Sequence, residues 1–141
     1  MEYFIDTNIF IRVLELENKK TFDECSKVLN LIKDSKIKAF ISTTVLAEIV
    51  WVLDSAYNEP KSKIAKSIDG IIKLNNLKIR DDFDLTKTID LFASNSVKFI
   101  DVLIASNPKI QSKKMTIISY DKDFDKLGVK RVEPSDIINR G

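Results

Sequence analysis

Apolar residues fall along the chain in two alternating patterns, short continuous runs and longer segments with helical spacing. Short apolar runs that end at polar residues predict strands, and helical spacing predicts amphipathic helices. Strands are expected at residues 2–6, 38–42, 77–79, 115–120 and 130–133. Helices are expected around 9–14 and at 21–33, 43–57, 60–74, 85–95, 99–110 and 134–140. In the segment 60–74 the residues expected to face inward are Ile64, Ile68, Ile71 and Ile72.

The alternation of strands and helices predicts an α/β fold, a three-layer sandwich with a mainly parallel central sheet flanked by helices. With 141 residues and no repeat or linker, residues 1–141 are expected to form a single domain. In sheets of this kind, ligands gather beyond the carboxyl ends of the strands. Asp6 is expected at such an end.

The chain contains no histidine, which excludes several kinds of active site. Without imidazole there is no ordinary Ser-His-Asp or Cys-His site, no imidazole metal ligand, and no His pair that cleaves RNA through its 2′-hydroxyl. Cys25 is the only cysteine, which excludes an intramolecular disulfide and a thiolate zinc cluster. A hydrolase of this composition must use carboxylates, lysines or a metal held by oxygen.

The net charge of +2, from 23 basic and 21 acidic residues, permits an anionic partner without indicating one. The N-terminal segment already carries Glu2 and Asp6, unlike a signal peptide. No apolar run approaches the roughly 18 residues of a membrane span. We therefore expect a cytoplasmic protein with no membrane association.

Four acidic residues stand in unusual surroundings. Asp6 and Asp121 each follow a predicted strand, whereas Glu48 and Asp101 interrupt apolar helical segments. Simpler explanations exist for each of them. Asp6 and Asp121 could cap helices, and Asp101 could be a first-turn acid favoured by the helix dipole. Glu48 could lie at a solvated edge of its helix, and Asp123 in a solvated loop.

All four acids nevertheless fall where a wound sheet would bring strand ends and helix starts together. Two carboxylates about 4 Å apart repel by roughly 4 kcal/mol at a surface-like dielectric, and four in one pocket multiply that cost. Protonation or a bound cation must relieve the repulsion. Oxygen ligands without His or Cys select Mg²⁺ or Mn²⁺. The sequence therefore predicts a site for one of these ions.

Four motifs carry these acids, in the order FIDTN, TTVLAEIVWVL, FIDVLIAS and IISYDKDF. Together they resemble the PIN-domain family, specifically its short bacterial and archaeal VapC-type toxins, over essentially the whole chain. The resemblance implies a divalent-metal-dependent endoribonuclease that is the toxin of a type II toxin–antitoxin pair. It also implies a homodimer and a cognate antitoxin protein. A metal-activated water would leave a 5′-phosphate and would not need the 2′-hydroxyl.

The resemblance also suggests roles for individual residues. Those matching the acidic cluster that holds the metal and carries catalysis are Asp6, Glu48, Asp101 and Asp121. Asn8 and Ser119 match supporting polar groups, although threonine is common at the latter position. Val102 and Ser106 stand where family members often have alanine. The resemblance leaves open whether Asp123 joins the metal shell, and its place in a turn predicts that it points toward solvent or caps that turn.

Several lysines are candidates for RNA phosphate contacts, although a solvated helix face is the better explanation for any single one of them. They are Lys61, Lys63, Lys66, Lys109, Lys113 and Lys114. Trp51 and Tyr57 could stack on a base. Helical spacing beside Val52 and Leu53 favours the core or a dimer interface for Trp51 instead.

Other functions are compatible with parts of the sequence. A non-catalytic scaffold of this fold could bind RNA or a protein without cutting. The loss of one of the four acids would support that function, but all four are present. A phosphatase using Asp6 as nucleophile usually needs a second Asp two residues later, where Asn8 stands. An RNA-processing nuclease of the same fold without an antitoxin differs only in its genetic context. A small antitoxin gene immediately upstream would separate the toxin from this alternative.

Overall fold

The computed structural model describes residues 1–139, and five of its segments are strands. They are β1 (Glu2–Ile5), β2 (Lys38–Ile41), β3 (Leu77–Ile79), β4 (Met115–Ile118) and β5 (Arg131–Val132). The helices are α1 (Thr7–Leu14), α2 (Lys19–Lys33), α3 (Thr43–Ser55), α4 (Lys61–Ile72), α5 (Leu85–Ser94), α6 (Phe99–Ala105), α7 (Pro108–Gln111) and α8 (Pro134–Ile138). A 3₁₀ helix, η1 (Lys122–Leu127), follows β4.

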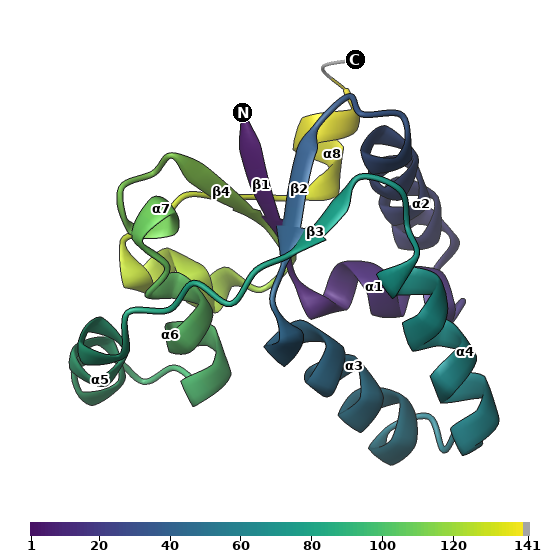
Figure 1. Cartoon of the computed structure of the whole chain (residues 1–141), viewed down its shortest axis with the longest axis horizontal. Coiled ribbons are helices and arrows are strands. Elements are labelled where there is room, and N and C mark those ends of the chain that lie inside the picture. The colour runs from purple at the N-terminus through teal and green to yellow at the C-terminus, as the bar shows by residue number, and fades with distance from the viewer. Residues whose placement is uncertain (140–141) are drawn as a thin grey trace.

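The strands form one sheet in the order β3-β2-β1-β4-β5, and every neighbouring pair is parallel. Helices lie on both sides of this sheet (Figure 1). α5, α6 and α7 lie on one side, and α1 to α4 lie on the other, where α8 packs against α2. The predicted α/β sandwich with a parallel central sheet is therefore confirmed.

The central strand β1 and its neighbour β4 bring the ends of distant segments together. In their register Glu2 lies opposite Met115, and Ile5 lies opposite Ile118. The strands therefore end level, and the backbone N–H of Asp6 donates to the carbonyl of Ile118 at 3.1 Å. Most residues of β1 and β4 are buried, which explains their continuous apolar sequences. The residues that directly follow β1 and β4 therefore lie close together at one edge of the sheet.

The predicted helix over 99–110 is wrong, because the structure has two helices there. Asn107 is the physical reason, since its side chain accepts a hydrogen bond from the backbone N–H of Lys109 at 2.8 Å and caps α7. Pro108 occupies the first position of that second helix, where its missing N–H costs nothing.

Two smaller expectations need correction or restriction. Ile72 was expected to face inward but is 50% exposed. The buried face of α4 contains Ile64 and Ile71. Ile72 follows Ile71 directly and therefore lies about 100° further round the helix, away from that face. The predicted helical turn at 134–140 is α8, and Arg140 lies outside the described residues. Within residues 1–139, no helix is both long enough and apolar enough to cross a membrane.

Candidate metal centre

Asp6 is buried where β1 ends and α1 begins. Its Oδ1 accepts a hydrogen bond from the backbone N–H of Thr7 at 2.8 Å, so the capping explanation is correct. Its Oδ2 accepts a second bond from the Ser119 hydroxyl at 2.6 Å and a third from the Asn8 amide at 3.2 Å. Asp6 therefore caps a helix and, at the same time, stands at the carboxyl edge of the sheet.

Asn8 and Ser119 join the end of β1 to the end of β4. The Asn8 amide nitrogen donates to the Ser119 hydroxyl at 3.0 Å, and its oxygen accepts from the backbone N–H of Tyr120 at 3.3 Å. The Ser119 hydroxyl also accepts from the backbone N–H of Asp121 at 3.0 Å. These bonds fix the positions of Asp6 and Asp121 relative to each other.

Asp101 is the most deeply buried acid of the site. It lies in the first turn of α6 and is only 1% exposed. Its Oδ2 has no hydrogen-bond partner among residues 1–139. Burial raises the pKa of Asp101 to about 8, although Lys98 opposes the shift, and the charges of Asp6 and other acids add to it. A buried carboxyl without partners is costly unless a proton or a cation compensates it.

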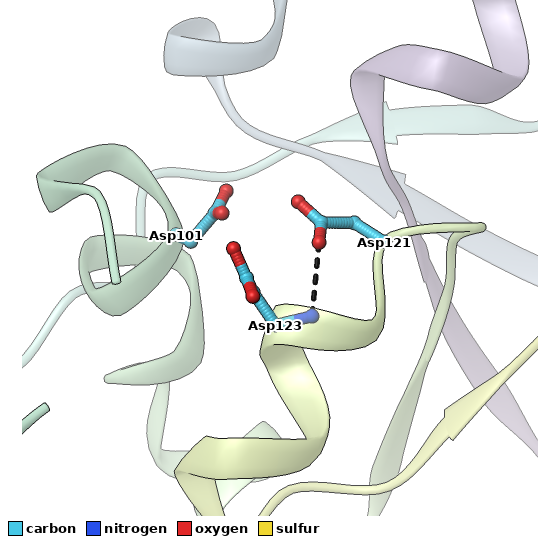
Figure 2. Close-up of side chains that lie close together, drawn as sticks. All are labelled: Asp101, Asp121 and Asp123. Atoms are coloured by element: carbon cyan, nitrogen blue, oxygen red, sulfur yellow. Dashed lines mark hydrogen bonds between the residues drawn. The ribbon is translucent and has the colours of Figure 1, made fainter. Parts of the chain in front are cut away.

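Asp101 from α6 and Asp121 and Asp123 from the start of η1 point toward one another (Figure 2). One carboxylate oxygen of each lies within 4.8 Å of the other two. Two ligands on opposite sides of a Mg²⁺ ion are about 4 Å apart, and Ca²⁺ allows about 5 Å. The spacing, the all-oxygen chemistry and the unsatisfied Asp101 oxygen therefore fit a divalent cation.

The prediction that Asp123 points toward solvent or caps its turn is wrong. η1 begins directly after Asp121, and Asp121 is the cap, because its Oδ1 accepts from the backbone N–H of Asp123 at 2.9 Å. Asp123 therefore lies in the first turn of η1, and its carboxylate faces Asp101 (Figure 2). Its side chain is 41% exposed and also pairs with Lys126 at 3.1 Å.

A pocket of about 320 Å³ opens over this edge of the sheet. Asp6, Glu48 and Asp121 line it, so Glu48 faces the site rather than open solvent. The Glu48 carboxylate accepts a bond from the Lys98 ammonium at 3.5 Å. Burial raises the pKa of Asp6 to about 6, even though bonds from Ser119 and Thr7 oppose the shift, and Glu48 and Asp121 raise it further.

Lys98 and Arg12 line the same pocket, and the sequence did not single out either of them. Burial opposes the charge of Lys98, but Asp101, Glu48 and Asp6 together raise its pKa. Lys98 stands three residues before Asp101 along the chain. That spacing is the one sequence signal that could have found it, and it is weak among 23 basic residues.

The predicted RNA-binding lysines are all exposed, and none of them lines this pocket. Lys61 lines an adjoining groove between α3 and α4. Lys63 pairs with Glu59. Lys66, the remaining candidate on α4, is exposed like the other lysines. Lys113 and Lys114 precede β4 and so lie at the opposite end of the strand from Ser119.

Trp51 and Tyr57 both line the pocket. Trp51 is 68% exposed, so it does not lie in the core, and the other part of the expectation, a dimer interface, stays a prediction. Leu53 is buried, whereas Val52 and the indole of Trp51 line the same pocket as Glu48.

The sequence matches the PIN domain profile over residues 3–130. The chain therefore belongs to the PIN domain family. No curated protein sequence matches it significantly.

Several solved structures share the fold. VapBC2 from Rickettsia felis, bound to a DNA fragment from its promoter, has a TM-score of 0.70 at 20% identity over 94% of this chain and 98% of that one. PAE2754 from Pyrobaculum aerophilum has a TM-score of 0.69 at 14% identity over 99% and 94%. VapC20 from Mycobacterium tuberculosis, a sarcin-ricin loop cleaving toxin, has a TM-score of 0.62 at 14% identity over 92% and 98%. At these identities the likeness concerns the fold.

Proposed function

We propose that this chain is a divalent-metal-dependent endoribonuclease that hydrolyses RNA phosphodiester bonds, using Mg²⁺ or Mn²⁺. One observation carries the proposal, namely the convergence of Asp101, Asp121 and Asp123 around a buried carboxylate oxygen that lacks a hydrogen-bond partner within the described part of the chain. Membership of the PIN domain family supports it. The absence of histidine is no obstacle, because this chemistry needs no imidazole.

The ion would be held by the three clustered aspartates, with Asp6 and Glu48 at the pocket wall. A divalent ion in such a site neutralises phosphate charge and lowers the pKa of a water. Other residues of the chain position the acids and the substrate. Ser119 and Asn8 hold Asp6 in place. Lys98, paired with Glu48, carries a positive charge at the place where a phosphodiester would enter.

The proposal extends to the biological role. We take the chain to be the toxin of a type II toxin–antitoxin pair, acting in the cytoplasm as a homodimer with a cognate antitoxin. Support comes from VapBC2 and from VapC20, which is named for cleaving the sarcin-ricin loop. Exposed apolar side chains on α5 and α6 suit a protein partner, since such patches mark interaction surfaces. They are Leu85, Ile89, Phe92 and Phe99.

RNA cleavage by the purified chain tests the activity. We expect cleavage with Mg²⁺ or Mn²⁺, none with a chelator, and recovery when metal is added back. The products should carry 5′-phosphates, and 2′-deoxy substitution at the scissile nucleotide should not prevent cleavage. A cyclic phosphate product would overturn the metal route. RNA binding without cleavage would favour the scaffold alternative.

The toxin role has its own test. Expression of the chain alone should arrest growth, and the small gene immediately upstream should restore it. The Asp101→Asn variant serves as control, because it should be harmless if toxicity depends on the acidic cluster. Equal toxicity of both forms would separate toxicity from the proposed chemistry.

A further inference from the structure

Trp51 is the only tryptophan of the chain and is 68% exposed. It lies on α3 three residues after Glu48, a spacing that puts two side chains on the same helix face. Both line the pocket above the acids. A single exposed apolar residue is common on protein surfaces, but this ring lines both the pocket and the adjoining groove rather than open surface.

The groups around Trp51 match the parts of a nucleotide. On one side is the pocket, whose charged lining residues are Asp6, Arg12, Glu17, Glu48, Lys98 and Asp121. On the other side, Trp51 lines the adjoining groove that also contains Lys61. Proteins bind unpaired nucleic acid by pairing cations with phosphates and stacking aromatic rings on bases. Trp51 has Lys98 and Arg12 in the pocket on one side and Lys61 in the groove on the other, so cations that can contact phosphates lie on both sides of the ring among the acids of the two hollows.

We infer that Trp51 stacks on an unpaired nucleobase next to the scissile phosphate, and so positions the RNA strand in the pocket. This rests on the proposed ribonuclease function. Inside a duplex both faces of a base are already stacked, so a paired base cannot present a face to the indole. In this arrangement Lys61 binds a neighbouring phosphate, while Lys98 binds the scissile phosphate above the acids.

The fluorescence of the chain reports on this contact directly, because it comes from a single indole. The wild-type protein is mixed rapidly, with Mg²⁺ present, with a pool of short unpaired oligoribonucleotides of random sequence. The same pool annealed into duplexes and a pool without nucleobases are the controls. Anisotropy of labelled RNA measures binding independently of the indole.

Stacking predicts that the unpaired pool quenches Trp51 fluorescence by about half or more, and that the two control pools quench by less than about a tenth. Binding without preferential quenching by the unpaired pool would overturn the inference while leaving the ribonuclease function intact. If no RNA binds and none is cleaved, the proposed function fails, and this inference fails with it.

Substitutions test the contribution of the ring to substrate binding. Trp51→Leu should raise KM for unpaired RNA about 5- to 150-fold, the loss of one stacked base, while Trp51→Phe should stay within about fivefold of wild type. The matched control is Val50→Ala, an exposed apolar neighbour that lines the groove but not the pocket, which should cleave like wild type. Because all three changes are at exposed positions, the melting temperatures should not change.

The same variants distinguish a base contact from a protein contact. A contact with a second chain would make the oligomeric state, rather than KM, depend on Trp51, and it would depend on Val50 too. If Trp51→Leu leaves KM unchanged, and Trp51→Leu and Val50→Ala alter the elution volume of the protein, Trp51 belongs to an interface between chains. That result would overturn the inference.

Discussion

A carboxylate buried as deeply as that of Asp101 can be stabilised by a proton or by a cation. Burial and neighbouring acids raise its pKa to about 8, so without metal it holds a proton near neutrality. A divalent ion would displace that proton and bind the oxygen that has no partner among the described residues. Protons and metal therefore compete for the same buried group.

This competition predicts the pH dependence of stability without metal. The pKa values of Asp6 and Asp101 are raised to about 6 and about 8, so between pH 4 and pH 8 the folded chain holds more protons than the unfolded chain. The free energy of unfolding should therefore fall as pH rises through this range. Asp101→Asn should remove part of the fall, by a few kcal/mol, since each pKa unit corresponds to about 1.4 kcal/mol.

Melting temperatures in chelator at pH 4 and pH 8 give the measurement. The gap between wild type and Asp101→Asn should shift in favour of the variant as pH rises. Parallel curves for the two proteins would mean that Asp101 titrates at its ordinary pKa, and that its burial has been overestimated.

The clustered aspartates should differ in their contributions to cleavage. Asp121→Asn should slow RNA cleavage by about two orders of magnitude or more, in the range expected when charge stabilisation at the reacting phosphate is lost. Asp123→Asn should cost about tenfold, because Asp123 is part of the cluster but is partly exposed and shared with Lys126. The RNA cleavage rates of the two variants at saturating Mn²⁺ test this prediction.

Asp125→Asn is the matched control for these two variants. It removes an acid from the same short helix, but Asp125 is exposed and bonds to Arg131 instead. Its cleavage rate should stay near that of wild type. A larger loss in Asp123→Asn than in Asp121→Asn would show that the two residues exchange roles.

At the scale of elements, the site depends on the alignment of β1 with β4. Ser119→Ala removes the hydroxyl that donates to Asp6 and accepts from Asn8 and Asp121. A buried hydroxyl with such bonds contributes roughly 1–3 kcal/mol. The variant should therefore melt lower and cleave more slowly, whereas Ser112→Ala, at an exposed hydroxyl, should do neither. Equal melting of both variants would contradict the alignment role of Ser119.

Elements with strong local signals could be predicted from the sequence. The strands at Glu2–Ile5 and Met115–Ile118 are short apolar runs ending at polar residues, and they appear where the pattern put them. The break at Asn107 was missed because Leu103 and Ile110, seven residues apart, keep helical spacing across it, although Asn107 followed by Pro108 is itself a local signal for a helix start. Local pattern therefore defined the layers better than the boundaries.

The site could be predicted only in part, for a related reason. Sequence placed Asp6 and Asp121 after strands, and the parallel register then brought them to one edge. The orientation of Asp123 depends on η1 starting at Lys122, and the exposure of Trp51 depends on how α3 packs. Lys98 reaches Glu48 only through the packing of α6 beside the sheet. These features belong to tertiary structure and have at most a weak local signal.

At the scale of the whole molecule, separate segments supply one site. The end of β1, the middle of α3, the start of α6 and the loop after β4 each contribute an acid or a cation. Such a site cannot form in the unfolded chain, so an ion that binds it must stabilise the fold by mass action. Metal binding and folding should therefore be linked.

Binding of Mn²⁺ to the purified chain, followed through the loss of the free-ion electron paramagnetic resonance signal, tests the central claim most directly. Wild type should bind Mn²⁺ and melt at a higher temperature when it does. Asp101→Asn should bind at least about tenfold more weakly and show little of that rise. Equal binding and equal melting shifts in the two proteins, or no binding by either, would contradict a metal centre built on the buried carboxylate of Asp101.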